Sequence, residues 1–176
     1  EDLPTIPKWI ARQVTKGDDA RALVFANHLN NADDSVWKNK IRMANDEDEE
    51  GGATVSQKSF VKSLKKYVLS SNHPFGSPDF ESAIQTKIFS NYWKAVADLL
   101  VDGEEETVLF KTIGVDLFNI VSGPVIRHLA NNKDYKVETI KELFRRAFSQ
   151  LPADSVGIST PEWWLSGSGA SDINSG

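Results

Sequence analysis

The segment from 79 to 101 reads DFESAIQTKIFSNYWKAVADLLV, and its apolar pattern sets the architecture that the rest of the chain must fit. Apolar side chains recur along it every three or four residues, which is the spacing of one face of an α-helix. One stripe consists of Phe80, Ile84, Ile88, Tyr92, Ala95 and Leu99, and a second set widens it: Phe89, Trp93, Val96 and Leu100. A helix that is apolar over so wide an arc packs against two or more neighbours. We therefore predict that 79–101 is the longest helix and the centre of the core.

Two further helices are expected before residue 31. Pro7 suits the first turn of a short helix, which Gly17 then interrupts. Asp18 or Asp19 is placed to cap a second helix, because a carboxylate at that position accepts hydrogen bonds from the first free backbone N–H groups. This second helix carries one apolar stripe, made of Ala22, Phe25, Ala26 and Leu29, and ends at 30–31.

A helix over 57–70 is predicted with Ser56 as its N-cap. Its apolar face consists of Phe60, Val61, Leu64, Tyr67 and Val68, and its opposite face carries Lys58, Lys62, Lys65 and Lys66. Clustered lysines bind the phosphates of nucleic acids, and a solvated polar face explains the same pattern equally well. We take these four lysines as the candidate nucleic-acid-binding residues.

On the C-terminal side of the central segment, helices are expected over 107–121 and 124–131. The order Ser122-Gly123-Pro124 resembles an N-cap followed by an early proline, which favours a break, and a single kinked rod is the alternative. A further helix is expected over 137–150. The pattern as a whole predicts a mainly α-helical bundle of about six helices.

One small β-hairpin is expected near 39–56. Ile41 and Met43 alternate with polar neighbours, and 53–55 can return as a second short strand. The acidic run 46–50 and the glycines at 51–52 between them are typical of a solvated loop.

Residues 1–152 are therefore expected to form the helical domain, and 153–176 a tail. In the tail, Thr160-Pro161-Glu162 starts a short turn that bears Trp163 and Trp164. These tryptophans are either candidate partner-binding residues or a hydrophobic clasp that folds back onto the core. Residues 166–176 are rich in glycine and serine, which favours a flexible end or a linker. Because the chain begins with Glu1 rather than Met, we expect a fragment or a processed product.

Composition narrows the functional classes. The chain has 176 residues, no cysteine and a formal net charge of −5. The lack of cysteine excludes disulfides, thiolate metal sites and thiol nucleophiles. The sequence has neither an apolar run of the roughly 20 residues that span a bilayer nor a signal peptide. These features favour a cytoplasmic protein with no membrane role.

No catalytic, metal or cofactor site is expected from the motifs. His28, His73 and His128 are not at metal-ligand spacing, and a structural role is the interpretation we favour for each. The glycine pairs lack the strand, helix and lysine of a phosphate-binding loop, and no Gly-x-Ser-x-Gly motif occurs. We therefore expect a chain that is not an enzyme.

Five segments, in this order and spacing, resemble a known family. They are ANHLN at 26–30, SVWKNKI at 35–41, TVSQKSF at 54–60, NYWKAV at 91–96 and LFKTIGV at 109–115. Together they are similar to the C-terminal half of proteins with a DGQHR domain, a family that includes the repressor of DNA phosphorothioation operons. The Asp-Gly-Gln-His-Arg motif itself is absent. In the family it lies N-terminal to this region, in a part that resembles ParB-type nuclease domains, so no functional residue of the family maps onto these positions.

The resemblance implies a non-catalytic helical accessory domain in DNA modification, genome defence or its transcriptional regulation. Its expected partner is duplex DNA, contacted either by the missing N-terminal part or by the lysine face. The alternative is a protein–protein interaction or homodimerisation module with no nucleic-acid role, since wide apolar helices can complete their burial in a dimer. An enzyme fragment ranks last, because no nucleophile, base and orienting group can be assembled from the sequence.

Overall fold

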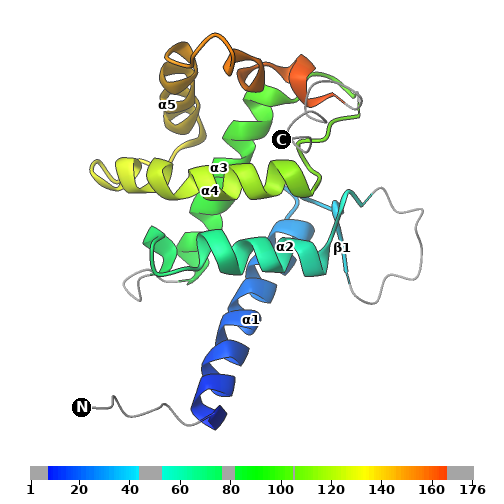
Figure 1. Ribbon diagram of the computed structural model, residues 1–176, viewed down its shortest axis with the longest axis vertical. Coiled ribbons are helices and arrows are strands. Elements are labelled where there is room, and N and C mark those ends of the chain that lie inside the picture. The colour runs from blue at the N-terminus through cyan, green and yellow to red at the C-terminus, as the bar shows by residue number, and fades with distance from the viewer. Residues whose placement is uncertain (1–7, 44–52, 77–81, 105, 166–176) are drawn as a thin grey trace.

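The computed structural model of this chain describes residues 8–43, 53–76, 82–104 and 106–165 (Figure 1). Its α-helices are α1 (Lys8–Asn31), α2 (Gln57–Ser63), α3 (Ser82–Leu100), α4 (Thr112–Ala130) and α5 (Val137–Ser149). Shorter helical turns are η1 (Leu64–Val68), η2 (Pro74–Gly76), η3 (Val156–Ser159) and η4 (Pro161–Trp164). The predicted fold class, a mainly α-helical bundle with a small strand pair, is confirmed. Among the described residues, no helix is both long and apolar enough to cross a membrane.

Helix α3 is the centre of the core, as its apolar arc predicts. It packs against α1, α5 and η4, and its buried side chains include Phe89, Tyr92, Trp93, Val96 and Leu100. An aromatic cluster joins it to the rest of the chain. The Trp37 ring lies 5.0 Å from that of Trp93 and 4.9 Å from those of Phe60 and Phe110, all in edge-to-face geometry. Burial of several large rings in this geometry stabilises the core beyond the area removed from water.

Helix α1 has 24 residues and α3 has 19, so the prediction that 79–101 is the longest helix is wrong. Helix α1 also runs without interruption through Gly17, which corrects the predicted break there. Gly17 is exposed within a continuous helix, and Asp18 and Asp19 lie inside it rather than capping it. A single helical glycine costs only about 1 kcal/mol relative to alanine, which does not outweigh a continuous hydrogen-bond ladder. The predicted stripe Ala22, Phe25, Ala26 and Leu29 is fully buried. The first turns of α1 extend beyond the other helices (Figure 1).

The strand pair is parallel, so the predicted hairpin is wrong. Strand β1 (Ile41–Arg42) pairs with β2 (Val55–Ser56) in the register Ile41 to Val55 and Arg42 to Ser56. A hairpin needs a tight reversal, whereas parallel strands need a connection of about a dozen residues, and the segment 43–54 supplies that length. The Asn30 side-chain oxygen accepts a hydrogen bond from the Ile41 N–H at 3.0 Å, which ties β1 to the end of α1. The acidic run 46–50 lies outside the described residues.

Helix α4 continues through Pro124, which corrects the predicted break at 122–124 and favours the single rod. Ser122 is not an N-cap: it is buried inside the helix, and its hydroxyl donates to the Asn119 carbonyl at 2.7 Å. The helix begins at Thr112 rather than at 107. Gly114 explains the tight packing there, because a Cβ at this position would lie 1.9 Å from the Leu109 carbonyl oxygen.

The Trp-bearing turn belongs to the core. Trp164 is completely buried, and its ring lies 5.6 Å from that of Phe118. Its indole N–H donates to the Ile158 carbonyl at 2.9 Å, and its own carbonyl accepts from the Val108 N–H at 2.7 Å. The predicted clasp is confirmed for Trp164, and its assignment as a partner-binding residue is wrong, since it has no exposed surface. The 166–176 segment lies outside the described residues.

Candidate nucleic-acid interface

The candidate lysines lie on the helical segment that follows β2. Ser56 caps it as predicted, because its hydroxyl oxygen accepts a hydrogen bond from the Ser59 N–H at 3.2 Å. The segment is not one α-helix over 57–70: α2 ends at Ser63 and continues as the π-helical turn η1. In this turn the Leu69 N–H donates to the Leu64 carbonyl, five residues back, at 2.8 Å. Single π-turns of this kind are frequent at functional sites.

The two faces of this segment are as the sequence predicts. Phe60, Leu64 and Val68 are buried against the core. Lys58, Lys62 and Lys66 are exposed, and Lys65 is half-buried. The buried face fixes the backbone, so the lysines project from a rigid support toward solvent.

The four lysines line a shallow, open hollow on the surface. This hollow, of about 540 Å³, lies between α2–η1 and α1, which contributes Asp19. A second hollow of about 450 Å³ shares Asp19, Lys58 and Val61 with the first. It extends to Leu23, Arg42, Met43, Ser56 and Gln57. Because they share three residues, the two hollows adjoin each other, and we call the pair the lysine groove.

Arg42 also belongs to the lysine groove, although it is not among the residues predicted from the sequence. The alternation around Ile41 contained the signal, because in a strand the neighbours of a buried residue point to the opposite face. Ile41 is buried and Arg42 is exposed on β1. The groove is thus lined by the cations Arg42, Lys58, Lys62, Lys65 and Lys66, and among the described residues that line it only Asp19 is an anion.

The four lysines differ in the contacts that their ammonium groups make with other side chains. Lys65 Nζ forms an ion pair with Asp19 at 2.5 Å. Lys66 Nζ lies 4.9 Å from the centre of the Tyr67 ring, and interaction with the Tyr67 side chain raises the pKa of the Lys66 ammonium group. Lys58 and Lys62 form no ion pair with any described residue. These two are therefore the side chains most readily available to an incoming anion.

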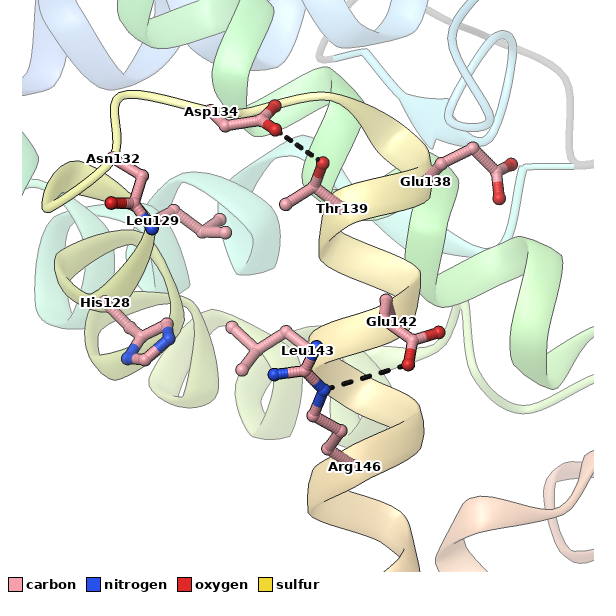
Figure 2. A pocket seen from close by; sticks show the side chains of 9 residues that line it. All are labelled: His128, Leu129, Asn132, Asp134, Glu138, Thr139, Glu142, Leu143 and Arg146. Carbon is pink, nitrogen blue, oxygen red and sulfur yellow. Dashed lines mark hydrogen bonds and ion pairs between the residues drawn. The ribbon is translucent and has the colours of Figure 1, made fainter.

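Away from the lysine groove, a cleft of about 430 Å³ lies between the end of α4 and α5 (Figure 2). It contains His128 and three carboxylates, all of which are already engaged. Glu138 pairs with Lys141 Nζ at 3.4 Å. Asp134 accepts hydrogen bonds from the Thr139 hydroxyl at 2.8 Å and the Lys136 N–H at 3.2 Å, which lower the pKa of its carboxyl. Glu142 pairs with Arg146 at 3.7 Å, as the dashed line in Figure 2 shows. These contacts fix the start and the exposed face of α5, which is a structural role.

A buried histidine and serine lie within hydrogen-bond reach of each other, as a catalytic base and nucleophile would. His73 Nε2 is 2.9 Å from the Ser122 hydroxyl, and the Phe75 N–H donates to His73 Nδ1 at 3.0 Å. Since Nδ1 accepts, Nε2 of the neutral ring carries the proton and donates to Ser122, which is the wrong tautomer for a base that activates serine. Burial, with Arg127 adding to it, lowers the His73 pKa to about 4. The pair is structural, in line with the structural role favoured for His73 from the sequence.

The remaining predicted partner-binding residue, Trp163, is half-buried, and its ring lies 4.7 Å from that of Trp164. Gly157 leaves room for the Trp163 ring in this position, because a Cβ on residue 157 would lie 2.8 Å from Trp163 Cδ1. Within the described ranges, no three His, Asp or Glu side chains gather in a way that would hold a metal ion.

The arrangement can bind anions, and the described residues bring together no base, nucleophile and orienting group. No protein-family model, curated protein or solved structure matches this chain.

Proposed function

We propose that this chain is a non-catalytic helical domain that contacts the phosphates of duplex DNA through the lysine groove. The observation that supports it is the meeting of Arg42 with Lys58, Lys62, Lys65 and Lys66 around one groove, whose lining has a single carboxylate among the described residues. Cationic side chains at a DNA backbone release condensed counterions, and this release supplies most of sequence-independent affinity.

The lining favours the backbone of a duplex over an unpaired strand. Proteins that bind single strands combine cations with exposed aromatic rings on which bases stack. Within the part of the chain that the structure describes, the residues that line the groove include no aromatic side chain, and Tyr67 next to it is half-buried. Lysine contacts to phosphate position a protein on DNA without reading the sequence. The expected binding is therefore independent of base sequence and strongly dependent on salt.

The resemblance to DGQHR-domain proteins gives this binding a cellular setting. On that basis, the chain is an accessory domain of a cytoplasmic DGQHR-type protein in DNA modification, genome defence or its transcriptional regulation. The net charge of −5 opposes binding of a polyanion by the chain as a whole. The domain therefore supplements a stronger DNA contact made elsewhere in such a protein, and by itself binds measurably only at low salt.

The test is fluorescence anisotropy of a labelled DNA duplex titrated with the protein across a salt series. The variant K58A/K62A/K66A removes the three exposed lysines of the groove. The control K87A/K94A/K136A removes the same charge from exposed positions on α3 and before α5. We expect the groove variant to bind roughly tenfold or more weakly at low salt, with a log–log salt slope less negative by about 2.7, and the control to bind like wild type. Equal effects of the two variants, or no binding by wild type at low salt, would contradict the proposal.

A protein-interaction module is the second candidate, because apolar side chains also line the groove. Leu23 is 37% exposed, and Met43 and Val61 are beside it in the lining. A second copy of the chain that seats an apolar side chain there would make a homodimer. Sedimentation equilibrium separates the candidates: a mass that rises with protein concentration and is unaffected by DNA favours the dimer.

A further inference from the structure

Asp19 sits where a phosphate would bind. It lies within α1, on the wall of the lysine groove opposite η1, and its carboxylate contacts Lys65 Nζ at 2.5 Å. A carboxylate and a phosphate oxygen make the same kind of charge-assisted hydrogen bond to an ammonium group. Lys65 is therefore already occupied by an anion that the chain itself supplies, while Lys58 and Lys62 are not.

The pair is held loosely enough to be exchanged. The Lys65 side chain is 34% exposed and that of Asp19 is 48% exposed, so water reaches both partners. Ion pairs with this degree of exposure change an equilibrium by only about two- to fivefold, and salt screens them. A polyanion that already contacts Lys58, Lys62 and Lys66 brings its next phosphate close to Lys65 and competes at high local concentration.

We infer that Asp19 is an internal competitor for phosphate, which Lys65 exchanges for a DNA phosphate when the lysine groove is occupied. This inference rests on the proposed function. Asp19 thereby makes the groove specific for a polyanion. An isolated phosphate ion binds Lys65 too weakly to displace the Asp19 carboxylate, whereas a duplex that spans the groove displaces it. Asp19 also keeps the affinity of the groove low.

Salt dependence gives this exchange a signature. In the wild-type chain, salt screens the ion pair between Asp19 and Lys65, so the competition by Asp19 weakens as salt rises and offsets part of the loss of DNA contacts. Asp19→Asn has no such ion pair to weaken. The log–log salt slope should therefore become more negative in D19N.

The experiment compares wild type, D19N and the control D18N by anisotropy with the same duplex across a salt series. Asp18 is the neighbouring exposed carboxylate of α1 and does not line the groove. Both variants remove one negative charge, so a general field effect raises the affinity equally in both. Release of Lys65 should raise the affinity in D19N alone by a further two- to fivefold, with the steeper slope.

A double-mutant cycle with Lys65→Ala isolates the exchange. We expect K65A to weaken binding more in the D19N background than in wild type, because Lys65 is fully available there. If wild type binds but D18N and D19N behave alike and K65A costs the same in both backgrounds, the inference is overturned and the proposed function stands. If neither wild type nor D19N binds at low salt, both are overturned.

Discussion

His73 Nε2 lies 2.9 Å from the hydroxyl of Ser122, and this contact joins the turn before α3 to the middle of α4. The polar chain continues inward: Ser122 donates to the Asn119 carbonyl at 2.7 Å, and the Asn119 amide donates to the Ser63 hydroxyl at 2.9 Å. It thereby reaches the last residue of α2, from which the lysine groove is built. The groove depends on a buried network whose histidine must stay neutral.

The first prediction is that acid destabilises the protein through His73. Its pKa is about 4 in the folded chain and 6.5 in its ordinary state, so between these values the unfolded chain binds the proton and the folded chain does not. The stabilising contribution is complete above pH 6.5 and is lost as the pH falls through about 4. It amounts to about 3 kcal/mol in the free energy of unfolding.

Urea unfolding at several pH values between about 7 and 4 measures this contribution. His73→Gln keeps a side-chain amide in the network and removes the titration, so its stability should depend less on pH than that of wild type. An equal loss of stability in both proteins would assign the acid sensitivity to other groups.

The second prediction concerns two glycines. Gly17 lies in open space within α1, so Gly17→Ala should stabilise the chain by about 0.5–1 kcal/mol through helix propensity. Gly114→Ala places a Cβ 1.9 Å from the Leu109 carbonyl oxygen and should prevent normal folding of the start of α4. Thermal unfolding followed by circular dichroism measures both. A destabilising Gly17→Ala would show that α1 does bend at this position.

The third prediction compares two buried tryptophans. The Trp164 indole N–H donates to the Ile158 carbonyl, whereas the Trp93 N–H has no hydrogen-bond partner among the described residues. Replacement by phenylalanine leaves a cavity of similar size at both sites. Only Trp164→Phe also removes the partner of a carbonyl, and it should cost about 1–3 kcal/mol more than Trp93→Phe. Denaturant unfolding of both variants tests this difference, and equal losses would refute the role assigned to the Trp164 hydrogen bond.

The sequence predicts those features that depend on local periodicity. The arc of α3, the stripe of α1 from Ala22 to Leu29 and the lysine face of α2 all follow from the helical repeat, which is a property of consecutive residues. The N-cap at Ser56 is local for the same reason. These features were enough to define the fold class and the candidate lysines.

Features that depend on contacts between residues far apart in the sequence could not be predicted from local sequence patterns. The parallel direction of β1 and β2 depends on a contact between residues 14 positions apart. The Thr54 N–H, just before β2, donates to the Lys40 carbonyl, just before β1. Pro124 stays inside α4 because the flanking Ser122 and Gly123 are buried against the turn at His73. The alternation around Ile41 places Arg42 on the exposed face of β1, but its position in the groove depends on the packing of β1 beside α2. The pairing of Lys65 with Asp19 likewise depends on the packing of α1 against α2 and η1.

Contact between the lysine groove and DNA phosphates can be measured by acylating the lysines with an amine-reactive reagent at low salt, with and without a DNA duplex. Mass spectrometry then gives the reactivity of each lysine. If the groove binds the duplex, Lys58, Lys62 and Lys66 react several-fold more slowly when duplex is present and recover as salt is raised, while the exposed Lys87 and Lys94 of α3 are unaffected. Unchanged reactivity at Lys58, Lys62 and Lys66, or protection confined to Lys87 and Lys94, would show that the groove does not contact DNA.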